Sequence, residues 1–327
     1  MKILSLLNTV FIPVVRNGKT FYMLLDSGCP FSFSNCITEI TSNDLGLQTT
    51  YHHNIPKQDN QFSQVLETSS RLLGLEVAGL LGLDFIQSFD NILINIREQI
   101  LDFNLPNFQA EFALDFNITN IMFDVMLTSI SPLSAGHDKT TVVDTGSFQC
   151  MAFQPIFNKY PVSRAWQGIT FTGPIDIDYY QNIELYFNDS YQGNYIFGVS
   201  PDLPSMPFDF ILGMNYISQY ELLIDLNNSK LRFKKSQAPA LINVNPTHTL
   251  GFQVVFENDK LVVNNVRPDC PNNIQANDII EVDSIDMTQE NKVNEIYNTL
   301  IQSSSNKPVK ARVNGEERVL VKIELFE

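Results

Sequence analysis

Short apolar runs recur along the chain and are separated by polar turn sequences, a pattern typical of β-strands. The apolar runs 10–15 and 20–25 flank Arg-Asn-Gly-Lys at 16–19, and Asn-Gly between two such runs predicts a β-hairpin. The runs 121–127 and 140–143 predict a second hairpin with a longer connection. The last strand of each hairpin stops abruptly at an Asp-Ser-Gly or Asp-Thr-Gly sequence.

The segments that follow the two Asp motifs also match each other. Residues 80–86, Leu-Leu-Gly-Leu-Asp-Phe-Ile, correspond to residues 211–217, Ile-Leu-Gly-Met-Asn-Tyr-Ile. Each segment is followed by two further apolar runs, at 89–95 and 99–103 in the first copy and at 220–226 and 230–233 in the second. This order predicts an internal duplication, with about a dozen extra residues in the second copy.

Asp26 and Asp144 carry the candidate chemistry, because a carboxylate at the end of a buried strand can point into a cleft. A lone Asp before Ser-Gly is more often a turn-capping residue, since Asp is common in turns. The duplicated four-part pattern argues against that alternative for Asp26 and Asp144. Two carboxylates within hydrogen-bonding distance share one proton and titrate as a unit. Such a pair can activate a water molecule for hydrolysis.

Two segments are candidates for hairpins that cover this cleft. One is the polar stretch 48–70, and the other is 166–174, which has two Gly and a Pro among β-forming residues. An ordinary surface loop is the alternative for both. Trp166, the only Trp, is by base rate more often a core or rim residue than a substrate contact.

The pattern of apolar runs is interrupted after Phe233. The polar segment 234–240 contains Pro and predicts a linker, and the residues that follow are enough for a small domain. Apolar residues at 293, 296, 297 and 300 have helical spacing, whereas 309–313 and 319–325 are strand-like. We therefore expect three domains, at 1–106, 107–238 and 239–327.

The composition of the chain excludes several classes of function. Apolar residues make up 44% of the 327 residues, enough for real cores, and the many Phe and Tyr favour strands. The formal net charge of −15 argues against nucleic acid as a partner, because phosphate binding needs clustered Lys and Arg. No Gly-rich phosphate loop and no Gly-x-Ser-x-Gly sequence is present.

Cysteine and histidine spacing predicts neither a metal site nor a cofactor. The four cysteines, at 29, 36, 150 and 270, have no metal-ligand spacing, and His137 and the pair His52-His53 are more typical of surface residues. Unpatterned cysteines favour a reducing compartment. The start, 1–7, resembles a signal peptide but lacks a small-residue cleavage site. We expect a cytoplasmic protein without a membrane span, with an exported or periplasmic location as the alternative.

The duplicated motifs resemble those of the retropepsin-like aspartic proteases over residues 10 to 235. The resemblance implies a mainly β, bilobal acid-protease fold, with two β-barrel lobes at 1–106 and 107–238. It implies an endopeptidase without a cofactor, with Asp26 and Asp144 as catalytic residues and a polypeptide substrate between the lobes. Because both lobes lie in one chain, we expect a monomer. The implied supporting residues are Ser27, Gly28, Thr145, Gly146, Ser147, Gly82 and Gly213, and in the family the hydroxyls at 27 and 145 interlock the two strand ends.

The residue after each Asp-Ser/Thr-Gly sequence differs between the copies. It is Ser147 in the second copy and Cys29 in the first, where retropepsins usually have Ala and pepsins Ser or Thr. We expect the Ser147 hydroxyl to donate to Asp144 and favour its charged form, whereas Cys29 is a poorer donor. Asp144 would then start as the ionised base and Asp26 as the acid.

Residues 239–327 resemble a PDZ domain, which is a small α+β fold. Leu250-Gly251-Phe252 fits the loop that binds a peptide C-terminal carboxylate in that family, and Asn277-Asp278-Ile279-Ile280 fits a second motif. The resemblance implies a peptide C-terminus as a partner, for substrate recruitment or regulation. The alternative function is a catalytically inactive peptide-binding or scaffold protein that uses this domain and the groove between the lobes.

Overall fold

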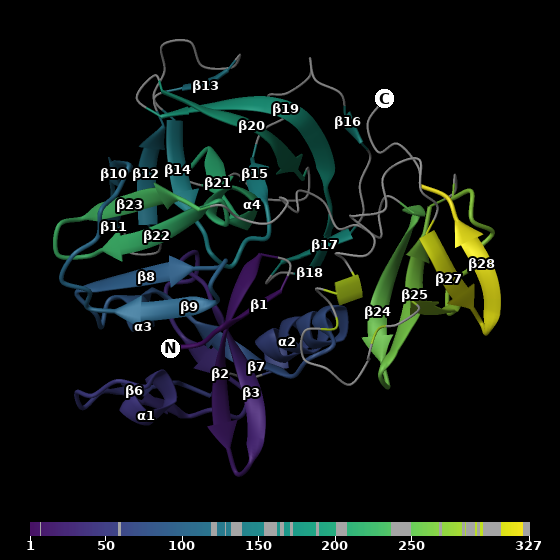
Figure 1. Ribbon diagram of the computed structural model, residues 1–327, viewed down its shortest axis with the longest axis horizontal. Helices are drawn as coiled ribbons and strands as arrows, with labels where there is room; N and C mark the ends of the chain where they lie inside the picture. The colour runs from purple at the N-terminus through teal and green to yellow at the C-terminus, as the bar shows by residue number, and fades with distance from the viewer. Residues whose placement is uncertain are drawn as a thin grey trace.

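The computed structural model describes residues 1–6, 8–57, 60–118, 123–127, 129–131, 139–153, 162–163, 167–170, 173–187, 190–200, 208–236, 250–267, 270–282, 285, 292, 295–296 and 309–322. Over these residues the protein is mainly β, as the sequence predicts (Figure 1). The described strands form open sheets, so closed barrels are not found in this part of the chain. The longest described helix is α2 (Asn60–Leu73).

The first copy is built on a five-stranded sheet in the order β1-β2-β3-β7-β4. The strands are β1 (Leu4–Leu6), β2 (Thr9–Arg16), β3 (Lys19–Leu25), β4 (Phe33–Ser34) and β7 (Val77–Leu81). The predicted hairpin is β2–β3, and its turn residues Asn17 and Gly18 have φ values of 53° and 76°. Strands β3 and β7 run parallel with Leu25 opposite Leu81, which places Asp26 beside Gly82.

The second copy repeats this arrangement in a larger sheet, in the order β11-β12-β14-β21-β15-β20-β19-β13. Strand β14 runs parallel to β21 with Val143 opposite Leu212, as β3 does to β7. The predicted hairpin is β12–β14. The strands are β11 (Asn117–Ile118), β12 (Phe123–Leu127), β13 (Ser129–Ser131), β14 (Lys139–Val143), β15 (Cys150–Ala152), β16 (Val162–Ser163), β19 (Asp178–Phe187), β20 (Ser190–Val199) and β21 (Phe210–Leu212).

A third sheet joins the two copies, in the order β10-β23-β22-β8-β9 (Figure 1). Strands β8 (Asn91–Asn95) and β9 (Ile100–Phe103) come from the first copy, and β22 (Tyr220–Asp225) and β23 (Lys230–Lys235) are their counterparts. Strand β10 (Phe112–Asp115) adds to β23. The antiparallel pairing of β8 with β22, Leu93 opposite Leu223, makes one continuous sheet from the matched segments of the duplication.

The two segments expected to cover the cleft have different structures. The stretch 48–70 is not a hairpin: it contains β6 (His52–Asn54) and most of helix α2. Strand β6 pairs with β5 (Glu39–Thr41), which precedes the short helix α1 (Ser42–Leu45). Asp44 of α1 forms an ion pair with Arg16 of β2. Strands β17 (Gln167–Thr170) and β18 (Gly173–Asp176) form the hairpin predicted for the second copy. Trp166 lies outside the described residues.

The C-terminal sheet has the order β24-β25-β26-β27-β28. Its strands are β24 (Phe252–Glu257), β25 (Lys260–Val266), β26 (Ile279–Val282), β27 (Val309–Val313) and β28 (Glu316–Leu320). The strand predicted at 309–313 is confirmed, whereas the one predicted at 319–325 was misplaced, because β28 ends at Leu320. Most of the predicted helix at 293–301 and of the linker at 234–240 lies outside the described residues, although β23 takes up 234–235.

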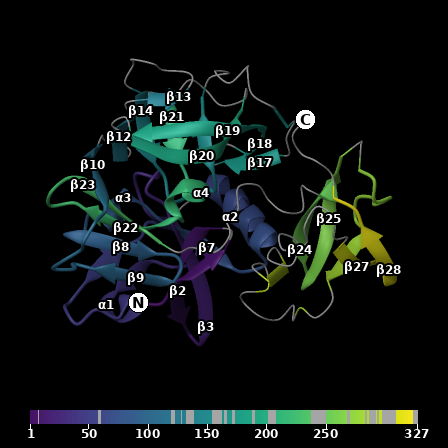
Figure 2. The same ribbon diagram turned by 45° about the horizontal axis from the view of Figure 1, so that its top comes forward.

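Helix α2 packs between the first copy and the C-terminal sheet, and it lies beside β24 in both views (Figures 1 and 2). Leu66 and Leu73 of α2 belong to one apolar cluster with Phe252 and Val254 of β24 and Leu80 of β7. An ion pair between Arg71 and Glu257 flanks this contact. The C-terminal sheet therefore shares an apolar core with the first copy.

A substitution at Gly74, the residue directly after α2, can test how much the contact between α2 and β24 stabilises the protein. Its φ is +63°, and a Cβ there would lie 2.7 Å from Cγ of Phe256 and 2.8 Å from Cε of Lys292. We expect Gly74→Val to lower the free energy of unfolding by about 1–2 kcal/mol more than Gly46→Val does. Gly46 is the matched control because its φ is +66° and none of the described residues lies within 4 Å of an added Cβ. Equal losses in urea unfolding would contradict the packing of α2 on β24.

Candidate active site

Asp26 and Asp144 occupy equivalent places in the two copies, one residue after the ends of β3 and β14. Each carboxylate accepts a hydrogen bond from the second residue of its own turn, Gly28 N–H to Asp26 Oδ1 and Gly146 N–H to Asp144 Oδ1, both at 2.8 Å. Asp26 is buried and Asp144 is half-buried. The duplication thus delivers two carboxylates in the same local geometry.

The two carboxylates meet across the boundary between the copies. A Cβ added to Gly28 would lie 2.5 Å from Oδ2 of Asp144, and one added to Gly146 would lie 2.6 Å from Oδ1 of Asp26. Each Asp therefore rests against the glycine of the other copy, where no larger residue fits. The two carboxyl groups are also close enough to share a hydrogen bond.

Ser27 and Thr145 interlock the two turns beneath this pair. The Ser27 N–H donates to Thr145 Oγ1 and the Thr145 N–H donates to Ser27 Oγ, both at 3.0 Å. Each hydroxyl then donates to the end of the Asp-bearing strand of the other copy, Ser27 Oγ to Val143 O of β14 at 2.8 Å and Thr145 Oγ1 to Leu25 O of β3 at 2.9 Å. Both side chains are completely buried, so the four bonds fix the strand ends relative to each other.

Gly82 and Gly213 lie where each turn packs against the short helix that follows, α3 (Leu83–Ile86) or α4 (Met214–Ile217). The Leu83 N–H donates to Cys29 O and the Met214 N–H donates to Ser147 O, both at 2.8 Å. A Cβ on Gly82 would lie 2.7 Å from Cys29 O, so the absence of a side chain permits this close approach.

Burial raises the pKa values of both carboxyl groups, and the proximity of Asp144 raises that of Asp26 further. The pKa of Asp26 is raised well above its usual value by burial first, and then by the charge of Asp144 and the hydrogen bond to it. Burial also raises the pKa of Asp144, but hydrogen bonds from Asp26 and from the N–H groups of Gly146 and Ser147 oppose it. The pKa of Asp26 is therefore raised further than that of Asp144, which favours one proton shared by the pair over two charged carboxylates.

The origin of this asymmetry differs from the expectation based on the Ser147 hydroxyl. Ser147 Oγ donates to Gln149 O at 2.8 Å, and only the Ser147 N–H reaches Asp144 Oδ1, at 3.1 Å. The Cys29 thiol turns to Phe31 O at 3.3 Å, and burial raises its pKa to about 12. The Ser147 hydroxyl is thus committed to Gln149, and backbone N–H groups donate to both carboxylates.

The loop at Leu250-Gly251-Phe252 enters strand β24. Gly251 has a φ of +84°, and its carbonyl accepts a hydrogen bond from Arg267 N–H at 3.0 Å. Leu250 and Phe252 are both buried, so their side chains belong to the core of the C-terminal sheet. Asn277 adopts a φ of +73°, which Asn tolerates better than most residues.

The two adjacent histidines have different environments. His52 is exposed and pairs with Glu39 at 2.7 Å, as expected for a surface residue. His53 is largely buried and contacts Ser32 and Asp84, so its prediction as a surface residue was wrong. A usable signal was present in the duplication, because Asp84 stands where the second copy has Asn215. His137 lies outside the described residues.

Comparison with known proteins finds no matching family model and no matching curated sequence. Among the described residues, no three His, Cys, Asp or Glu side chains gather in a group that could hold a metal ion. None of the helices described is both long and apolar enough to cross a membrane.

Proposed function

We propose that the protein is an aspartic endopeptidase of the retropepsin-like class, with Asp26 and Asp144 as its catalytic residues. The observation that carries this proposal is the contact of the two carboxyl groups, one from each copy, above the interlocked hydroxyls of Ser27 and Thr145. A turn-capping role for either Asp accounts for its bond to its own turn, but not for the burial of two carboxylates against each other, which is costly unless a proton is shared.

The reaction that fits this pair is direct attack of water on a peptide bond. Asp144, the ionised partner, accepts a proton from a water molecule while the water oxygen bonds to the carbonyl carbon. Asp26 gives its proton to the carbonyl oxygen, which yields a tetrahedral diol without a covalent enzyme intermediate. The C–N bond then breaks as Asp144 returns a proton to the amine and Asp26 recovers one from the diol.

The substrate in this proposal is an extended polypeptide that lies between the two copies. The hairpin β17–β18 is the proposed covering element, supported by its antiparallel pairing and by Gly173 and Pro174 at the start of β18. A peptide C-terminus remains the proposed partner of the loop at Leu250-Gly251-Phe252. Because α2 lies along the outer strand β24, a peptide that adds to this strand has to compete with α2. We propose a cytoplasmic monomer.

Cleavage of an unfolded protein between pH 3 and pH 8 tests this function. We expect the full chain to cleave and both Asp26→Asn and Asp144→Asn to reduce kcat by at least about 10³-fold, because each removes one half of the acid–base pair. Asp90→Asn is the matched control, since the Asp90 side chain is exposed and distant in the chain from both motifs. Absence of cleavage by the native chain at every pH would contradict the proposal and favour the peptide-binding scaffold.

A further inference from the structure

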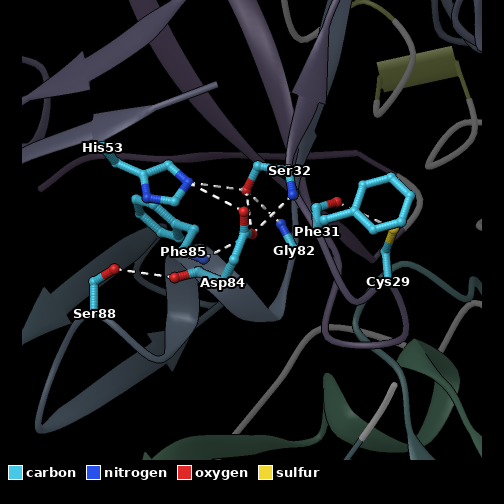
Figure 3. Close-up of polar contacts among 8 residues, drawn as sticks. All are labelled: Cys29, Phe31, Ser32, His53, Gly82, Asp84, Phe85 and Ser88. Atoms are coloured by element: carbon cyan, nitrogen blue, oxygen red, sulfur yellow. Dashed lines mark hydrogen bonds and ion pairs between the residues drawn. The ribbon is translucent and has the colours of Figure 1, made fainter. Parts of the chain in front are cut away.

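A second polar cluster lies next to the turn that carries Asp26, and Figure 3 shows its members. Asp84, at the start of α3, accepts hydrogen bonds from Ser32 N–H at 2.8 Å and Ser32 Oγ at 2.6 Å. Ser32 Oγ accepts one in turn from Gly82 N–H at 3.0 Å. Ser32 is completely buried, and its hydroxyl proton is committed to Asp84. The cluster therefore joins the Asp26 turn to the Gly82 segment and is not a nucleophilic site.

His53, on β6, completes the cluster. Its Nε2 lies 3.5 Å from Asp84 Oδ2 and 3.3 Å from Ser32 Oγ, and its ring packs edge-on against Phe85 with centroids 5.8 Å apart. The imidazole is 12% exposed. This geometry selects a form of His53 with a proton on Nε2, so that the ring can donate to the carboxylate.

The second copy has an uncharged version of the same connection. Asn215, the counterpart of Asp84, accepts from Cys150 N–H at 2.8 Å, and its side-chain amide donates to Ile196 O at 3.0 Å. Asp84 has no amide, so its second oxygen needs a donor, and His53 supplies it. The first copy thus has an ionisable pair where the second copy has a neutral amide contact.

The cluster reaches Asp26 through a short chain of hydrogen bonds. Leu83 N–H and Asp84 N–H donate to Cys29 O and Pro30 O, at 2.8 and 3.3 Å, and the Gly28 N–H of the same turn donates to Asp26. We propose that His53 is a positioning residue for Asp26, acting through Asp84 and Ser32 on residues 28–32. This proposal rests on the proposed function of the Asp26–Asp144 pair.

The charges around His53 support this role. Burial raises the pKa of Asp84, but hydrogen bonds from His53 and Ser32 outweigh it and hold the pKa below its usual value. Asp84 is therefore the carboxylate partner of His53. The nearby Cys29 and Tyr51 have pKa values of about 12, raised mainly by burial, so both stay neutral. Because the pKa of Asp84 is lowered on folding, the stabilisation it gives is present at neutral pH and is lost as the pH falls through the folded pKa.

The test compares His53→Leu, His53→Gln and the control His52→Leu in the full chain. Loss of the His53 contact should loosen residues 28–32 and weaken the Gly28 hydrogen bond, which normally lowers the pKa of Asp26. We expect His53→Leu to lower kcat about tenfold with little change in KM, and to move the upper limb of the pH–rate profile to higher pH. His53→Gln, which keeps a donor, should restore most of kcat, and His52→Leu should match the native chain.

A titration of the Asp carboxyl ¹³C signals makes the outcome independent of cleavage. If the native chain has no activity, the proposed function falls, but a rise in the pKa of Asp26 in His53→Leu, absent in His52→Leu, still supports the positioning role. If neither the titration nor the pH–rate profile distinguishes His53→Leu from His52→Leu, the positioning role is wrong even in an active enzyme.

Discussion

The substitution Thr145→Val is expected to lower the free energy of unfolding by about 2–5 kcal/mol and to reduce peptide cleavage severely. Val has nearly the shape of Thr but lacks the hydroxyl, so the Ser27 N–H and the Leu25 carbonyl lose their partner. Each buried group left unpaired costs about 1–3 kcal/mol. The same bonds hold the two Asp turns together, so their loss also displaces the carboxylates from each other.

Thr141 provides the matched control for this experiment. It lies on β14, the strand that leads to Thr145, and is completely buried, yet its hydroxyl has no hydrogen-bond partner among the described residues. Thr141→Val therefore removes an unsatisfied polar group and should leave the free energy of unfolding unchanged or slightly higher. Equal losses for Thr145→Val and Thr141→Val in urea unfolding would show that the interlock contributes nothing specific.

The second large effect is a pH-dependent gain of stability in Asp26→Asn. The pKa of Asp26 is raised in the folded protein, so Asp26 stabilises the fold below its unfolded pKa, and this stabilisation is lost as the pH rises through the folded pKa. An Asn has no proton to lose and still accepts the Gly28 hydrogen bond. We expect Asp26→Asn to raise the free energy of unfolding at pH 7.5 on the order of 1–3 kcal/mol, while it abolishes cleavage.

Urea unfolding at pH 4 and pH 7.5 measures this difference. The gain should shrink at pH 4, where the native Asp26 keeps its proton, and the exposed control Asp90→Asn should show no comparable change. A gain of the same size at both pH values would mean that the charge of Asp26 is not its origin. A loss at pH 7.5 would contradict the burial of a like-charged pair.

Much of the architecture was predictable from the duplication. The hairpins that end at Asp26 and Asp144 follow from apolar runs whose order repeats. The repeat could not show that β8 and β22 pair with each other, because partner choice between equivalent strands is a tertiary property. The stretch 48–70 was misassigned because few apolar residues mark its helix, and Leu66 and Leu73 acquire their role only by contact with β7 and β24.

The side-chain contacts of the site could not be predicted from the sequence, because they depend on the direction in which each side chain points. Sequence placed Ser147 beside Asp144 but could not show that its hydroxyl prefers Gln149 O. Nor could it show that His53 turns inward while His52, its neighbour, faces solvent. Alternation along the short strand β6 explains this difference once the strand is known. Only an alignment of the two copies shows that Asp84 stands where the second copy has the amide side chain of Asn215.

The most direct test of the account is to count the proton that Asp26 and Asp144 share. In the full chain, the ¹³C titration of Asp carboxyl groups should show one signal with a pKa far above that of an ordinary Asp, assigned to Asp26 by its loss in Asp26→Asn. In Asp144→Asn this pKa should fall, because the neighbouring charge is gone. Two carboxyls that titrate independently near the ordinary Asp value would contradict the paired site and, with it, the proposed protease.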